Sequence, residues 1–195
     1  MAIQQQKLSI DTVWELVMAP ENDSKRFYLI DGELFTFPRA RYRLPGMLIA
    51  TLSACLANHI DRHDLGIATL SAGYHPPNDR YTLLGPAVAF TSAARLPKPL
   101  HDGYVPVMPD LAVEIAAPGE TLGHLRQKAI VYLNNGSRLV WIVLPAEKGI
   151  DVCRAVDGPR LDIEFVPQTG TLSGDDVLPG FELEVTRLFP ITESS

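Results

Sequence analysis

The apolar and polar positions of this chain follow two spacings, which distinguish predicted helices from predicted strands. Between residues 45 and 63 the apolar positions recur at helical offsets and form one stripe, which contains Leu48, Leu52, Cys55, Leu56 and His59. Residues 119–136 have the same spacing, and a shorter stripe at 11–19 ends before Pro20. Three helices are therefore expected.

The other apolar runs are short, as is typical of strands. Residues 27–37 read FYLIDGELFTF, two runs around Asp31-Gly32, which is a strong hairpin signal. Further runs lie at 66–75, 81–90, 108–119, 138–145, 149–156 and 161–167. Their order with the helices predicts an α/β (α+β) fold: a mixed central sheet flanked by helices, preceded by a helix and a hairpin. The length of 195 residues fits one domain, 1–195.

Composition narrows the possible functions and the compartment. The formal net charge is −6, which argues against a general nucleic-acid coat protein but leaves room for a local basic cleft. The two cysteines, Cys55 and Cys153, have no metal or redox spacing, and no run is long enough to span a bilayer. The first residues, MAIQQQK, lack the apolar core of a signal peptide. We expect a cytoplasmic protein.

One carboxylate stands out because it interrupts an apolar strand, MPDLAVEIAAPG at residues 108–119. Alternation along a strand places Leu111, Val113 and Ile115 on one face and puts Glu114 on the other, among small residues. Three interpretations are open: Glu114 faces solvent, it pairs with a nearby lysine or arginine, or it belongs to an active site.

Two other residues bear on this choice. Asp110 lies four strand residues from Glu114, about 13 Å away, so a regular strand does not let both acids bind one Mg²⁺ ion. Lys128 borders the apolar face of the helix at 119–136, and packing of this helix on the sheet could bring its ammonium towards Glu114. The alternative is a surface lysine whose charged end reaches solvent.

Several short segments then occur in a recognisable order: RFYLIDGEL at 26–34, GPAVAF at 85–90, PDLAVEIAAP at 109–118, VWIVLP at 140–145 and LPGF at 178–181, with Lys128 and Tyr132 between them. In this order the chain resembles, over about residues 8–189, a large bacterial family of putative restriction endonucleases in the PD-(D/E)XK nuclease superfamily. The resemblance implies a restriction endonuclease-like core and Mg²⁺-dependent hydrolysis of phosphodiesters in DNA. It makes Glu114 the metal-binding catalytic glutamate and Lys128 the catalytic lysine.

Other positions depart from the family pattern. The metal-binding aspartate of the preceding strand is replaced by Ala87, and the acid expected in the hairpin is replaced by Tyr28. Asp79, Asp31 and Glu33 lie in or beside turns and are poorly placed to substitute. Two functions therefore remain open: an endonuclease-like protein with weak or no activity, using Mg²⁺ if active, or a catalytically dead module that binds nucleic acid or protein.

Nucleic-acid contact has its own candidates. Arg39, Arg41 and Arg43 alternate around Tyr42, and an extended backbone would place the three arginines on one face; Lys25, Arg26 and Arg80 are further candidates. The alternative is a charged, solvated edge strand. A homodimer is also expected, built on such an edge or on the apolar strands at 140–156.

Overall fold

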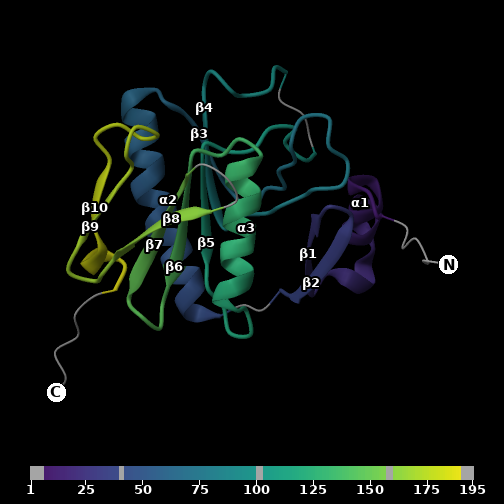
Figure 1. Cartoon of the computed structure of the whole chain (residues 1–195), viewed down its shortest axis with the longest axis horizontal. Coiled ribbons are helices and arrows are strands. Elements are labelled where there is room, and N and C mark those ends of the chain that lie inside the picture. The colour runs from purple at the N-terminus through teal and green to yellow at the C-terminus, as the bar shows by residue number, and fades with distance from the viewer. Residues whose placement is uncertain (1–6, 40–41, 100–102, 157–159, 190–195) are drawn as a thin grey trace.

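The structure, a computed structural model, describes residues 7–39, 42–99, 103–156 and 160–189. Its elements are drawn in Figure 1. Within the described residues these are α1 (Ile10–Met18), η1 (Pro20–Asn22), β1 (Lys25–Ile30), β2 (Glu33–Pro38), α2 (Arg43–His63), β3 (Gly66–Leu70), β4 (Val88–Ser92), β5 (Leu111–Ile115), α3 (Leu122–Asn134), β6 (Leu139–Leu144), β7 (Gly149–Ala155), β8 (Leu161–Val166), β9 (Thr171–Ser173), β10 (Glu182–Glu184) and η2 (Val185–Arg187).

The core of the fold is a six-stranded mixed sheet in the order β3-β4-β5-β6-β7-β8. Only β5 and β6 run parallel, and the remaining neighbours in this sheet are antiparallel. A parallel pair needs a crossover, which α3 supplies between β5 and β6. The predicted fold class, a mixed sheet with flanking helices after an N-terminal helix and hairpin, is confirmed.

The two long helices cover opposite faces of this sheet, as Figure 1 shows. Leu111, Val113 and Ile115 of β5 pack in the cluster that contains α2, whereas Ala112 packs in the cluster that contains α3. The predicted alternation along β5 is therefore confirmed. Glu114 lies on the α3 side of the strand.

The sequence explains where several of these elements begin and end. Thr121 caps α3, its hydroxyl accepting from the His124 N–H at 3.2 Å. Between β1 and β2, Asp31 and Gly32 adopt positive φ angles of 52° and 82°, the backbone of a tight hairpin turn. The predicted hairpin is confirmed, and its strands pair in register from Lys25 with Pro38 to Ile30 with Glu33.

Two predicted boundaries and the predicted stripe of one helix are corrected. The helix expected from Pro45 starts at Arg43, because proline is tolerated in a first helical turn. Its buried stripe is Leu48, Leu52, Leu56 and Ile60, while Cys55 and His59 are only half-buried. The strand expected over 81–90 starts at Val88, since Pro86 cannot donate to a ladder; Leu83 and Leu84 form isolated bridges instead.

The strands at 140–156 are also not available as a dimer surface. Each residue of β6 is buried, and β7 is buried from Gly149 to Cys153, because β5 and β8 flank this pair. Among the described residues, no helix is both long and apolar enough to cross a membrane.

Candidate functional site

Glu114 is a buried acid with two close partners, both on α3. The side chain of Glu114 is only 6% exposed, and its Oε1 lies 2.6 Å from the Lys128 ammonium nitrogen. The Tyr132 hydroxyl donates to the same oxygen at 2.9 Å. Because Lys128 and Tyr132 are four residues apart, one face of α3 presents both groups to β5. The approach of Lys128 to Glu114, one of the alternatives that the sequence leaves open, is present, and the solvent-facing alternatives for both residues are wrong.

The Lys128 ammonium is enclosed on other sides as well. Its nitrogen lies 3.9 Å from a carboxylate oxygen of Glu120 and 5.1 Å from the centre of the Tyr28 ring. Two carboxylates and an aromatic face therefore surround one buried cation. This arrangement compensates the cost of taking the ammonium out of water.

Glu120 was missed by sequence reasoning. Glu120 directly precedes Thr121, the N-cap of α3, and acids are common at the start of a helix. The only signal in the sequence is that Glu120 follows Glu114 by six residues. In the structure its side chain is 5% exposed. Burial raises the pKa of the Glu120 carboxyl, the Glu114 charge adds to this, and Lys128 opposes it. Glu120 is therefore a second acid at the site.

Tyr28 occupies the hairpin position where the family resemblance expects an acid. Its ring stacks on Phe35 and Phe37, with centroids 4.8 and 5.3 Å away. The buried hydroxyl has no hydrogen-bond partner among the described residues. Burial raises the pKa of this phenol, and the charges of Glu120 and Glu114 raise it further. A neutral phenol thus stands close to the two carboxylates.

A pocket of about 370 Å³ opens beside this cluster. Glu114 and Glu120 line it, and so does Ala87, the position where the resemblance expects the metal-binding aspartate. Two exposed arginines, Arg26 at the end of the hairpin and Arg39 after β2, also line this pocket. Acids thus lie at its inner end, and two arginines lie where it meets solvent. We call this the carboxylate pocket.

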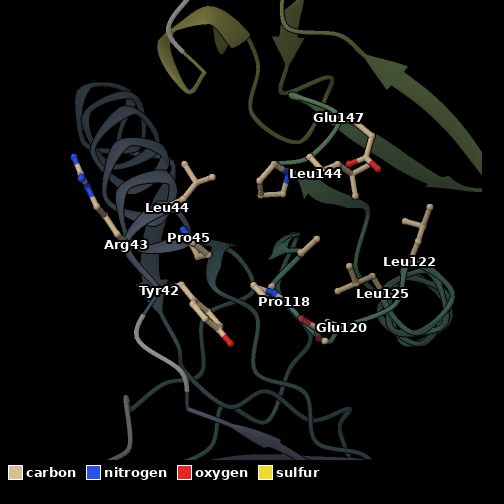
Figure 2. A pocket seen from close by; sticks show the side chains of 15 residues that line it. Tyr42, Arg43, Leu44, Pro45, Pro118, Glu120, Leu122, Leu125, Leu144 and Glu147 are labelled. Carbon is tan, nitrogen blue, oxygen red and sulfur yellow. The ribbon is translucent and has the colours of Figure 1, made fainter. Parts of the chain in front are cut away.

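A second cavity, of about 600 Å³, adjoins the carboxylate pocket and is mostly apolar. Figure 2 shows it between the start of α2, the loop after β5, the start of α3 and the turn after β6. We call it the apolar groove. Both cavities share the same five lining residues: Tyr42, Pro45, Ala117, Pro118 and Glu120.

Two other candidate acids, Asp110 and Asp79, have structural partners. Asp110 accepts from Arg95 at 2.9 Å and from the Ser92 N–H at 2.8 Å, so it tethers the end of β4 to the start of β5. Asp79 accepts from the Tyr81 N–H within its own turn. Neither lines the carboxylate pocket.

The extended face predicted for the three arginines can be compared with the structure only at Arg39 and Arg43. Arg39 lies in the loop after β2, whereas Arg43 is the first residue of α2, where helical backbone replaces strand alternation. Tyr42 precedes the helix and is 43% exposed. Arg41 lies outside the described residues. Of the further candidates, Arg80 pairs with Asp11, and Lys25 donates to Asn22.

These donors do not fit a magnesium site of the kind that the resemblance implies. Mg²⁺ requires oxygen ligands in near-octahedral geometry, usually including carboxylates that are free to bind it. Here Glu114 is already neutralised by Lys128, and an alanine side chain stands at position 87. In the part of the chain that the structure describes, no three His, Cys, Asp or Glu side chains are grouped as a cation site.

Comparisons with known proteins agree with the resemblance. The family described as "Uma2: Putative restriction endonuclease" matches residues 13–186. The fold is similar to the crystal structure of a putative nuclease of the DUF820 family from Anabaena variabilis, with a TM-score of 0.75 and 16% sequence identity. The similarity covers 93% of this chain and 97% of that one. No curated protein matches the sequence significantly.

Proposed function

Because this chain belongs to the Uma2 family of putative restriction endonucleases, we propose that it binds nucleic acid at the carboxylate pocket and hydrolyses phosphodiester bonds weakly or not at all. One observation carries the proposal: Glu114 is paired with Lys128 in a pocket whose other family acid is replaced by Ala87. The catalytic roles of Glu114 and Lys128 remain predictions of the family resemblance.

The charges at the pocket support binding more than cleavage. Stabilisation of a phosphodiester transition state needs a cation aimed at the developing negative charge. The Lys128 ammonium is instead held between Glu114 and Glu120. Arg26 and Arg39 are exposed at the pocket and form no ion pair within the described part of the chain. They are therefore available for phosphate oxygens.

Cleavage is tested by incubating the pure protein with supercoiled plasmid in Mg²⁺ or Mn²⁺, beside a Glu114→Gln variant. We expect little or no nicking above the level of the variant. Complete metal-dependent conversion of the plasmid that is abolished by Glu114→Gln would show an active nuclease and overturn this part of the proposal.

The role of position 87 is tested by metal binding rather than activity. Ala87→Asp adds a carboxylate to those of Glu114 and Glu120 in the pocket, so calorimetry should detect Mn²⁺ binding by this variant and none by the parent chain. The double variant Ala87→Asp/Glu114→Gln is the control and should lose the gain. If Ala87→Asp gains nothing, Ala87 does not occupy the position of the family aspartate.

We also propose that the protein is a cytoplasmic homodimer. The dimer is supported by the edge strand β8, which exposes Phe165 (47%). The cytoplasmic location is supported by the two free cysteines, Cys55 and Cys153. Sedimentation at increasing concentration should show a dimer that Phe165→Lys weakens. A monomer at all concentrations would contradict the dimer without affecting the nucleic-acid proposal.

A further inference from the structure

The apolar groove has the properties of a binding site that the family reaction does not require. Its volume of about 600 Å³ lies within the range of small-ligand sites, about 300–1,000 Å³. Its walls are mostly proline, leucine and alanine residues of α2, α3, the loop after β5 and the turn after β6, and the charged residues Arg43 and Glu147 also line it. A charged phosphodiester backbone has no affinity for such walls, whereas a flat, weakly polar ring can pack against them.

The side chain of Tyr42 at the groove is exposed to solvent and is therefore accessible to a stacking partner. Tyr42 is 43% exposed and, as Figure 2 shows, extends from the start of α2 towards Pro118 and Glu120. Stacking on such an exposed ring is the way in which proteins hold unpaired bases without reading their sequence. Arg43, the next residue, also lines the cavity at the start of α2.

The groove also holds a polar group suited to the edge of a base. Glu120 lies on the wall between the two cavities, with its side chain 5% exposed. A carboxylate accepts hydrogen bonds from the exocyclic amino groups of bases. Glu120 is 3.9 Å from Lys128, which leaves carboxylate lone pairs for such a donor.

Charge complementarity identifies the occupant. The carboxylate pocket presents the exposed Arg26 and Arg39 directly beside the apolar groove, and the two cavities share a wall. Two arginines beside an apolar groove that contains a stacking ring match the chemistry of a nucleotide, in which one sugar joins the phosphate to the base. In a duplex the base would be stacked inside and could not reach the groove.

We propose that the apolar groove receives an unpaired base of single-stranded nucleic acid, stacked on Tyr42, while Arg26 and Arg39 hold the neighbouring phosphate. This inference rests on the proposed function, because it assumes that nucleic acid binds at the carboxylate pocket. It adds the substrate class: single strands or splayed ends are preferred over intact duplex.

The test is fluorescence anisotropy with three labelled probes of about ten nucleotides, within the site sizes of single-strand binders. These are a mixed-sequence DNA strand, its duplex, and a strand of abasic sugar-phosphates of equal length. We expect the intact strand to bind more tightly than both others. Tyr42→Ala should weaken binding of the intact strand roughly tenfold and leave the abasic strand unchanged.

Matched variants separate stacking from a loss of fold. Tyr42→Phe should keep the affinity, because stacking needs only the ring. Tyr81→Ala removes a tyrosine of similar exposure, 45%, elsewhere on the molecule and should have no effect. Circular dichroism of each variant confirms that the fold is intact.

The outcomes distinguish the two proposals. Equal affinity for strand and duplex, or undiminished binding by Tyr42→Ala, overturns the base site while nucleic-acid binding stands. An abasic strand that binds as tightly as the intact one does the same. Binding of none of the probes overturns the proposed function itself, and the base site with it.

Discussion

At the scale of single residues, the cluster around Glu114 is a buried ion pair with an enclosed ammonium. Lys128 and Glu114 meet at 2.6 Å with side chains 5% and 6% exposed. In such a place removal of one charge leaves the other unpaired and desolvated, which costs far more than removal of both. The pair therefore couples the stability of the fold to the chemistry of the pocket.

This coupling predicts the effect of single and double variants on the free energy of unfolding. Glu114→Gln or Lys128→Met alone should each destabilise the protein by about 3–5 kcal/mol. The double variant should be destabilised by clearly less than the sum of the two. Urea denaturation measures all three.

An exposed ion pair provides the control. Arg138 and Asp176 also meet at 2.6 Å, but their side chains are 45% and 82% exposed. Asp176→Asn should cost less than about 1 kcal/mol. Equal costs at the two pairs would contradict the role assigned to burial.

Glu120 predicts how stability depends on pH. Because burial raises the pKa of Glu120 above its ordinary value of 4.5, the folded protein holds this proton more tightly than the unfolded chain. The contribution of Glu120 to stability therefore falls as the pH rises through 4.5 towards the folded-state pKa. Glu120→Gln has no such proton, so the unfolding free energy of this variant should rise relative to that of the parent as the pH increases from 4 to 7. A constant difference across this range would show that Glu120 ionises as freely when folded.

At the scale of elements, the hairpin and α3 build the site together. The hairpin supplies Tyr28 and carries Arg26, and α3 supplies Lys128 and Tyr132. The His124 ring of α3 packs edge-on against Phe35 at 5.4 Å and Phe37 at 5.7 Å. A defect in the hairpin turn is therefore expected to disturb the pocket wall as well as the strands.

Gly32 is the position that tests this turn. Its φ of 82° is unfavourable for other residues, and an added Cβ would lie 2.5 Å from the Cβ of Lys7. Gly32→Ala should lower the unfolding free energy by more than about 1 kcal/mol. Gly180→Ala, at a φ of 74° with nothing within 4 Å, isolates the backbone cost and should be milder. Thermal denaturation of both variants measures the difference.

At the scale of the whole molecule, the net charge of −6 disfavours the binding of negatively charged nucleic acid, so binding requires a local concentration of arginine side chains. Arg39 and Arg26 supply it at the carboxylate pocket, and Arg43 lines the apolar groove. The strength of binding should accordingly depend strongly on salt.

The triple variant Arg39/Arg41/Arg43→Ala tests this surface. Its affinity for single-stranded DNA should fall, and the slope of log affinity against log salt should shrink by about 0.7 for each lost phosphate contact. The control is Arg62/Arg160/Arg187→Ala, which removes the same charge from exposed arginines elsewhere. A similar loss in both variants would indicate a general effect of charge rather than a site.

The sequence by itself determined most of the elements and singled out Glu114 and Lys128 as candidate site residues. Periodicity located α2, α3 and the strands, Asp31-Gly32 located the hairpin, and alternation put Glu114 on the face of β5 that meets α3. These follow from spacing within one segment, which the sequence contains in full. Alternation failed at Arg43, where a helix had already begun.

Only the tertiary structure decided how the site is enclosed. The burial of Glu120, the Tyr28 ring beside Lys128, and the two adjoining cavities depend on segments that are far apart in the chain. Solvent exclusion and the distances between charges are properties of that packing, and local patterns do not encode them. The sequence therefore located the acid in the strand, and packing determined that a lysine already neutralises it.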